Sequence, residues 1–293
     1  MLEIIAFSNM KLAGNCEIII TMNFEGMYGG FHLIYLFLFS LLLLIEILYL
    51  RKKDPNDKTI DLIIRVSGVI LLLLVTINRI AIVSWNIQNA SSPEAENPHW
   101  WCVIPDTWCS FSAFVLGFSC LFGKRNNIAL HFAVYTSTFG CIMCMFLPFF
   151  LNVQGFWEPR SIFGMLHHSW AFHLIIFLFM KGEFMPSKKK TLAFLAGAAI
   201  MMGLGYFEIY VMGYDHSMQI GDPFVQASPF LSILTSWYSS LLALFLLALG
   251  AGAIGDAIKK KSEAEDIQRN AHSNFSSASA AVEKALAGRL VKL

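Results

Sequence analysis

The chain has 293 residues, of which 56% are hydrophobic and only 14% are charged, and its formal net charge at pH 7 is +1. Soluble domains average about 25% charged residues, so the composition excludes an ordinary soluble protein and indicates an integral membrane protein. The near-zero net charge gives no reason to expect nucleic-acid binding. The six cysteines are scattered and predict neither a disulfide framework nor a zinc ribbon.

The first 28 residues form an N-terminal segment to which the sequence assigns no role. They lack a basic region followed by a small-residue cleavage site, so no signal peptide is predicted. Met22 is an alternative start to Met1 and would remove most of this leader. At the other end, residues 256–293 are polar and rich in Ala and Ser. They predict a cytoplasmic tail, either disordered or lying on the inner leaflet as an amphipathic helix.

Seven stretches are long and apolar enough to cross a bilayer, which requires about 20 mainly apolar residues. Each can satisfy its own backbone hydrogen bonds in lipid as an α-helix. The predicted fold class is therefore all-α, a bundle of seven transmembrane helices occupying residues 29–255. The seven spans lie at about 30–50, 60–84, 104–122, 128–150, 162–180, 191–212 and 229–255.

The distribution of Lys and Arg predicts the orientation of these spans, because cytoplasmic loops carry the excess of basic residues. Basic residues gather after the first, third and fifth spans and at the end of the seventh. The remaining connections, 85–103, 151–161 and 213–228, contain a single basic residue, Arg160. The N-terminus is therefore expected outside and the C-terminus in the cytoplasm. The predicted location is the cell membrane if the protein is bacterial.

All seven tryptophans map to the outer loops or to the outer third of a span. Tryptophan is typical of the headgroup level on both sides of a membrane, whereas here it is concentrated on one side. The pattern favours either ordinary interfacial anchoring or an aromatic-walled cavity on the outer face. Trp108, Trp170 and Tyr214 would belong to such a wall and contact a substrate.

The stretch SIFGMLHHSWAFHL, residues 161–174, places three histidines in an apolar span. His167 and His168 lie about two helical turns below the outer end, and His173 lies deeper. Adjacent residues of an α-helix are separated by about 100°. We therefore expect one of His167 and His168 to face the bundle and the other to face a neighbouring helix or the headgroups. Six of the eight histidines, His173 among them, map to the outer half.

Other ionisable residues map to the same side of the predicted bundle. Asp106 and Cys109 share a face at the start of the third span, and Glu208 lies within the sixth. A carboxylate inside a span needs a partner or water, and Arg79 is the expected partner of Glu208. Together these residues predict an outer pocket, in which Arg79, Glu208 and Asp215 would bind substrate.

A cysteine beside a histidine can transfer its proton to the imidazole, and the resulting thiolate is a nucleophile suited to acyl transfer. A carboxylate would orient the ring. In this interpretation Cys109 is the nucleophile, His168 or His167 is the base and Asp106 is the orienting group. Two alternatives remain open: Cys109 is a packing residue, or Asp106, Cys109 and a histidine bind zinc. No histidine spacing supports the metal, and no cofactor is predicted.

Three stretches carry a resemblance to a known family: IPDTWC, LFGKRNNIALHFAVYTSTFGCIMCMFLPFF and SIFGMLHHSWAFHLIIFLF. In order and spacing they resemble the YwaF-like bacterial integral membrane proteins, over about residues 30–250. The family's short motif positions are occupied here by Pro105, Cys109, Gly140, Pro148 and the pair His168–Ser169.

This family is similar to eukaryotic transmembrane protein 164, a phospholipid acyltransferase, and more distantly to the androgen-induced fatty-acid-ester hydrolases. Those proteins use a Cys or Thr nucleophile on one helix and a histidine on another. The resemblance implies Cys109 as nucleophile and His168 as base, with His167 as the close alternative. One departure concerns Thr107, which stands where the bacterial pattern has a histidine. It implies a lost or altered activity unless Asp106 or a histidine from YDHS substitutes.

Three classes of function fit these observations. The first is a lipid acyltransferase or hydrolase near the outer leaflet, with membrane lipids as partners. The second is a transporter or receptor, although the seventh span lacks a lysine for retinal and only Gly203 and Gly205 hint at the interrupted helices of transporters. The third is a non-catalytic membrane subunit, since polar groups also join helices. A disulfide between Cys102 and Cys109 would remove the nucleophile. No oligomeric state is predicted.

Overall fold

The computed structural model describes residues 25–52, 55–92, 95–148, 150–221, 242–265 and 267–268. Nearly all of the predicted leader, the first half of the predicted seventh span and most of the predicted tail lie outside the described residues. Within the described residues the fold is all-helical, and β-structure is limited to an isolated bridge between Ser217 and Ile220.

The helices follow one another in the order predicted from the hydrophobic stretches. Their bounds are α1 Gly30–Lys52, α2 Asp57–Gln88, η1 Trp100–Val103, α3 Trp108–Phe122, α4 Leu130–Phe146, α5 Leu151–Gln154, α6 Pro159–Met180, η2 Lys188–Lys190 and α7 Thr191–Tyr210. A further helix is Leu242–Glu265, which continues past the boundary predicted at residue 255.

Five helices of the described chain are long and apolar enough to cross a membrane: α1, α2, α6, η2 with α7, and Leu242–Glu265. The apolar helices α3 and α4 occupy the predicted third and fourth spans but have only 15 and 17 residues. Both are shorter than the roughly 20 residues that a complete crossing requires. The structure therefore supports a multi-pass integral membrane protein, and the number of crossings stays a prediction.

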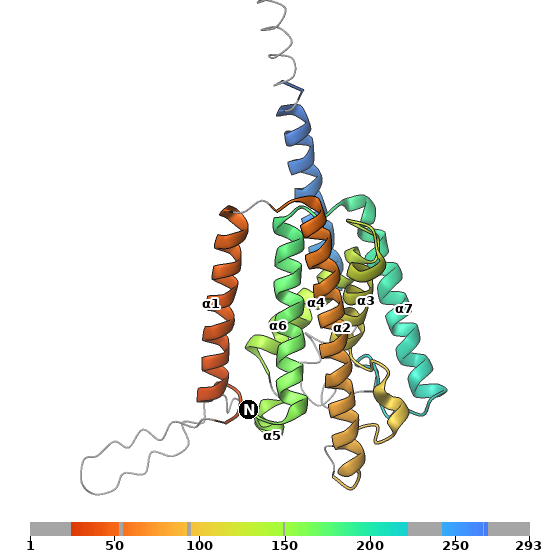
Figure 1. The fold of residues 1–293 in the computed structure, drawn as a ribbon. Helices are drawn as coiled ribbons and strands as arrows, with labels where there is room; N and C mark the ends of the chain where they lie inside the picture. Colours follow the sequence, from red (N-terminus) through yellow and green to blue (C-terminus); the bar gives the residue numbers. More distant parts are fainter. Residues whose placement is uncertain are drawn as a thin grey trace, which may run out of the picture.

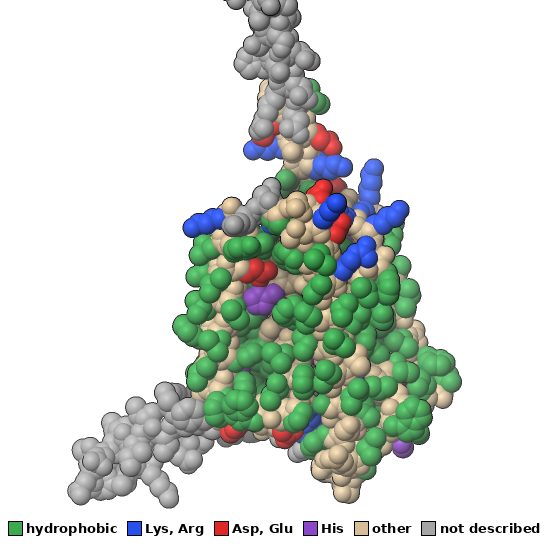
Figure 2. Space-filling model, in the orientation of Figure 1, with side chains coloured by type: hydrophobic (Ala, Val, Ile, Leu, Met, Phe, Trp, Pro, Cys, Tyr) green, Lys and Arg blue, Asp and Glu red, His purple; other side chains and the backbone are tan. Residues whose placement is uncertain are grey.

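Figure 1 shows the long helices side by side, with α1 at one edge and α7 at the other. Helix α2 packs against α3 and α6, and α4 packs against α3, α6 and α7. Between them lies an apolar core that includes Leu71, Val75, Leu116 and Met201, each fully buried. Figure 2 shows a broad band of hydrophobic side chains on the face of the protein that is in view, with Lys and Arg gathered beyond one end of the band. Such a surface is typical of a protein whose flanks face lipid.

Helices α2 and α3 approach closely because each places a glycine at their crossing. A Cβ atom added to Gly68 would lie 2.9 Å from the carbonyl oxygen of Gly117, and one added to Gly117 would lie 2.7 Å from Leu72 Cγ. Small residues at such crossings allow membrane helices to pack by backbone contact. This contact sets the distance between the two helices that carry Arg79 and Cys109.

Replacing Gly68 with alanine is expected to lower the free energy of unfolding by about 1–3 kcal/mol, because the new methyl group meets backbone that cannot move aside. Thermal unfolding in detergent measures the change. Gly203→Ala is the matched control: this exposed glycine of α7 has no atom within 4 Å of an added Cβ, so we expect a gain of about 0.5–1 kcal/mol. Equal stability of the two variants would contradict a tight crossing.

Candidate functional site

A cavity of about 360 Å³ lies among α2, α3, α4 and α6, toward the end of the bundle where α3 and α6 begin. Chemistry-bearing side chains from each of these helices reach it. They include Arg79, Cys109, Cys144, Arg160, His167 and His168. The structure thus brings together the thiol and both imidazoles that the sequence singled out.

His167 and His168 of α6 each direct one ring nitrogen to the backbone and leave the other available. The Nδ1 atoms of His167 and His168 lie 2.9 Å and 2.8 Å from the carbonyl oxygens of Phe163 and Gly164, one turn back along the helix. Because a carbonyl only accepts, each Nδ1 carries the proton and each Nε2 keeps its lone pair. Both Nε2 atoms are buried and have no hydrogen-bond partner in the part of the chain that the structure describes. This is the tautomer in which an imidazole accepts a proton from a nucleophile.

The expectation that only one of these neighbouring histidines faces the bundle was wrong. His167 and His168 are 2% and 7% exposed, both line the cavity, and their ring centroids are 3.9 Å apart. Helical side chains lean back toward the N-terminus rather than pointing straight outward, and here each ring folds onto its own helix. Helix α6 is also flanked by both α2 and α4, so two adjacent residues can both be covered.

Cys109 lies in the first turn of α3, whose N-cap is Thr107. The Thr107 hydroxyl accepts from the Ser110 backbone N–H and donates to the Ser110 hydroxyl. A Cβ atom added to Gly140 of α4 would lie only 2.7 Å from the Cys109 sulfur, so the thiol occupies room that the glycine leaves. Among the described residues no hydrogen bond joins this sulfur to His167 or His168, but all three also line a small void of about 10 Å³. Cys102 and Cys109 are both free, so the alternative of a disulfide between them was wrong.

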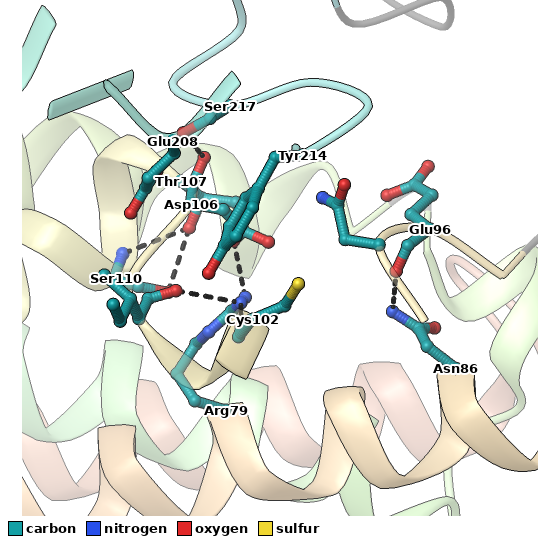
Figure 3. Close-up of polar contacts among 12 residues, drawn as sticks. Arg79, Asn86, Glu96, Cys102, Asp106, Thr107, Ser110, Glu208, Tyr214 and Ser217 are labelled. Atoms are coloured by element: carbon teal, nitrogen blue, oxygen red, sulfur yellow. Dashed lines mark hydrogen bonds and ion pairs between the residues drawn. The ribbon is translucent and has the colours of Figure 1, made fainter. Parts of the chain in front are cut away.

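Arg79 is 2% exposed and is held by several acceptors at the rim of the cavity (Figure 3). Its Nη1 atom lies 2.5 Å from Asp106 Oδ1, and its Nη2 atom donates to the carbonyl oxygens of Cys102 and Ile104 at 2.6 Å and 3.2 Å. The expected pairing of Arg79 with Glu208 was therefore wrong. Asp106 binds the Arg79 guanidinium and not an imidazole, so it does not orient a histidine ring. The reason is its position: Asp106 follows the η1 turn closely in the chain, and Arg79 binds the backbone of that turn.

Glu208 of α7 is fully buried beside this cluster, and the segment after α7 covers it (Figure 3). The Ser217 hydroxyl donates to Glu208 Oε2, while Oε1 has no partner among the residues that the structure describes. Met218 connects this covering segment to the start of α3. Its N–H donates to the Asp106 carbonyl oxygen at 2.6 Å, and its carbonyl oxygen accepts from Trp108 Nε1 at 2.9 Å. Glu208 therefore lies outside the cavity lining, sealed by its own loop.

The aromatic residues expected to wall the pocket have other roles. Trp108 is buried against the covering segment. Trp170 donates from Nε1 to the Ser67 carbonyl oxygen and lines a separate groove between α1 and α6. Tyr214 donates to the Trp101 carbonyl oxygen at 3.0 Å, and burial raises the pKa of its hydroxyl, so it stays a donor. None of these rings lines the cavity.

Asp215, which was expected to bind substrate, and His173, which was mapped to the same half of the bundle, both lie away from the cavity. Asp215 is exposed, and its backbone N–H donates to Asn97 Oδ1. His173 lies toward the opposite end of the bundle from the cavity: its Nδ1 atom lies 2.5 Å from Glu46 Oε2, near the end of α1 that carries Arg51 and Lys52. The sequence places His173 only five residues beyond His168, but a helix advances about 1.5 Å per residue, which is enough to leave the cavity.

Sequence reasoning left Arg160 out of the site. Its guanidinium carbon lies 3.4 Å from the Trp85 ring centroid, its Nε donates to Glu158 Oε2 at 2.7 Å, and the side chain is 5% exposed. Its carbonyl oxygen accepts from Asn78 Nδ2, and both residues line the cavity. A signal was present, because Arg160 is the single basic residue of the predicted outer connections.

The described part of the chain contains no set of side chains placed to bind zinc. No group of three or more His, Cys, Asp and Glu side chains there is placed to hold a metal ion, and Asp106 is engaged by Arg79. No protein-family model matches the sequence, and no curated protein or solved structure matches the chain.

Proposed function

We propose that this integral membrane protein is a lipid acyltransferase or hydrolase, with Cys109 as nucleophile and His168 or His167 as base. One observation carries the proposal: the thiol and two imidazoles with unpartnered Nε2 atoms line the same cavity. A nucleophile, a base in the accepting tautomer and space for a substrate are the elements that covalent acyl transfer needs. The resemblance to the YwaF-like family supports the same pair, since Cys109, Gly140 and His168 occupy its motif positions.

The proposed reaction has two steps. In the first, His168 or His167 accepts the Cys109 proton at Nε2, and the thiolate attacks the carbonyl carbon of an acyl ester. The ester C–O bond breaks, the imidazolium returns the proton to the departing alkoxide, and a thioester remains on Cys109. In the second step an acceptor hydroxyl or water gives its proton to the imidazole and attacks the thioester. The C–S bond breaks, the acyl group passes to the acceptor, and the imidazolium returns the proton to the Cys109 thiolate.

The two arginines that line the cavity, Arg79 and Arg160, favour a phospholipid as the substrate class. Arg79 and Arg160 both reach the cavity, and guanidinium groups bind phosphate by paired hydrogen bonds. Each is balanced by a carboxylate, Asp106 and Glu158 respectively, so the protein holds these cations in place without a ligand. In this scheme Asp106 positions Arg79 for the headgroup and has no contact with the base.

We propose that the chain crosses the membrane seven times, with the N-terminus outside and the cavity toward the outer leaflet. Lys and Arg gather at the opposite end of the bundle (Figure 2), as cytoplasmic loops do. The short helices α3 and α4 would complete their crossings with the non-helical residues that flank them. Of these, Thr107, Leu147 and Phe150 line the cavity, where such backbone is tolerated. The location would be the cell membrane if the protein is bacterial.

A non-catalytic lipid-binding subunit is the second candidate. The observation in its favour is that no hydrogen bond joins the Cys109 thiol to either imidazole, although bonds of this kind often tighten only when substrate binds. Thr107 serves as the N-cap of α3 and stands where the family pattern has a histidine. In this second case the cavity would bind the same phospholipid without cleaving it.

Covalent labelling distinguishes the two candidates. An alkyl-chain iodoacetamide is applied to the purified protein in lipid nanodiscs, and the modified cysteine is identified by mass spectrometry. We expect Cys109 to react faster than the other cysteines, and His167→Gln with His168→Gln to slow that reaction at least tenfold, because an activated thiol needs its base. Cys120→Ser on the same helix is the control and should leave labelling unchanged. An unaltered Cys109 rate in the double histidine variant would favour the non-catalytic subunit.

A further inference from the structure

A second cavity, unrelated to Cys109, opens between α1, α2 and α6. It has a volume of about 620 Å³, and most of its lining is apolar, with Leu38, Phe39, Leu42 and Phe177 among the lining residues. Figure 2 shows acidic and histidine side chains set into the hydrophobic band on this face of the protein. The groove therefore combines a hydrocarbon-lined wall with a polar site inside the region that faces lipid.

The polar site is the pair formed by Glu46 of α1 and His173 of α6. The His173 Nδ1 and Glu46 Oε2 atoms are 2.5 Å apart, and the two side chains are 22% and 21% exposed. Each of the two side chains uses one polar atom in this contact. The remaining atoms, Glu46 Oε1 and His173 Nε2, have no hydrogen-bond partner among the described residues. Ionisable residues placed among lipid-facing helices are costly and mark functional sites.

We propose that this groove binds a monoacylglycerol-like lipid, with a diol head at Glu46 and His173 and its acyl chain along α1. Two adjacent hydroxyl groups match two neighbouring free atoms, since one hydroxyl donates to Glu46 Oε1 and the other pairs with His173 Nε2. A fatty acid or a phosphate would bring an anion against Glu46, and an uncharged head avoids that repulsion in a low-dielectric site.

The length of the groove suits a single acyl chain. Along α1 the lining residues run from Tyr35 to Glu46, which is about 16 Å of helix. At the Tyr35 end the wall is fixed, because the Tyr35 hydroxyl donates to the Met165 carbonyl oxygen and bonds the Ser169 hydroxyl. At the other end, the Lys181 side chain bonds the Leu50 carbonyl oxygen and holds α1 to the end of α6. The groove thus lies between two fixed contacts.

Photo-crosslinking tests the assignment with the full-length protein in nanodiscs. A monoacylglycerol carrying a diazirine on its acyl chain is the probe, and crosslinked peptides are mapped. We expect the crosslinks to lie on α1 and α6. Unlabelled monoacylglycerol should block this crosslinking at a concentration at least tenfold lower than the matching fatty acid or phosphatidylcholine. Equal competition by all three would overturn the proposal, because it would show only annular lipid.

Two variants separate binding from folding. Leu42→Trp fills the groove at an exposed position and should reduce crosslinking at least tenfold, whereas Ile34→Trp, exposed on α1 but outside the lining, should not. Glu46→Ala with His173→Ala should abolish the preference for the diol head while chain-dependent labelling persists. Unchanged labelling of Leu42→Trp, or an unchanged preference in the double variant, would refute the site. Neither result depends on Cys109, so this proposal and the acyl-transfer proposal fail separately.

Discussion

Replacing His168 with glutamine is expected to lower kcat for cleavage of an acyl ester by about 10²–10⁴-fold, the usual contribution of a positioned general base. Glutamine keeps the side chain polar but cannot accept the Cys109 proton. The rate is measured with a fluorogenic medium-chain ester in mixed micelles. His167→Gln is measured in parallel, because both rings offer a buried Nε2 atom to the same cavity, and the larger loss identifies the base.

The same assay includes variants that separate the thiol from its surroundings. Cys109→Ala should remove the activity, and adding either histidine substitution to Cys109→Ala should cause no further loss, because residues that act as one unit are not additive. Cys120→Ser, which lies further along α3 and outside the cavity, should keep the wild-type kcat. If both histidine variants retain the wild-type kcat, neither ring is the base.

Replacing Arg79 with methionine is expected to lower the free energy of unfolding by about 3–5 kcal/mol, because it leaves the Asp106 carboxylate, whose side chain is only 14% exposed, without its cation. Arg79 Nη1 binds Asp106 at 2.5 Å, and its Nη2 satisfies two carbonyl oxygens of the η1 turn. Methionine fills much of the volume but offers no donor, so three acceptors lose their partner together.

Unfolding of the detergent-solubilised protein, followed by tryptophan fluorescence against denaturant, measures this change. Arg65→Met is the matched control on the same helix, since Arg65 makes an exposed bond to the Leu121 carbonyl oxygen, and its effect should stay within about 1 kcal/mol. Adding Asp106→Asn to Arg79→Met should recover part of the loss by removing the unpaired charge. Similar stabilities of Arg79→Met and Arg65→Met would show that the Asp106 pair is not a structural element.

The helices were predictable from the sequence because hydrophobic length is a local property. The run from Gly30 to Lys52, for example, is mainly apolar and has Glu46 as its single carboxylate before its two terminal basic residues, and nothing distant is needed to recognise it. The co-location of Cys109 and His168 was also predicted, since both map about the same distance from one end of their spans. Depth along a helix can be counted from the sequence.

The direction in which a side chain points around its helix, and the residue with which it pairs, could not be predicted by counting along the sequence. Arg79 lies at a depth similar to both Asp106 and Glu208, and only the fold of η1 and of the segment after α7 decides which carboxylate it binds. The pair of Glu46 and His173 joins residues 127 positions apart, and it depends on how α1 leans against α6. These choices are made by tertiary packing, which a pattern of apolar residues does not specify.

The glycine of α4 also decides how a substrate can approach. Because the sulfur of Cys109 rests in the space where residue 140 lacks a side chain, the flank of the sulfur that faces α4 is blocked by backbone. An electrophile must then arrive from the opposite flank. Covalent inhibitors would follow the same single trajectory, and a reagent whose bulk extends sideways from its warhead should be excluded whatever its intrinsic reactivity.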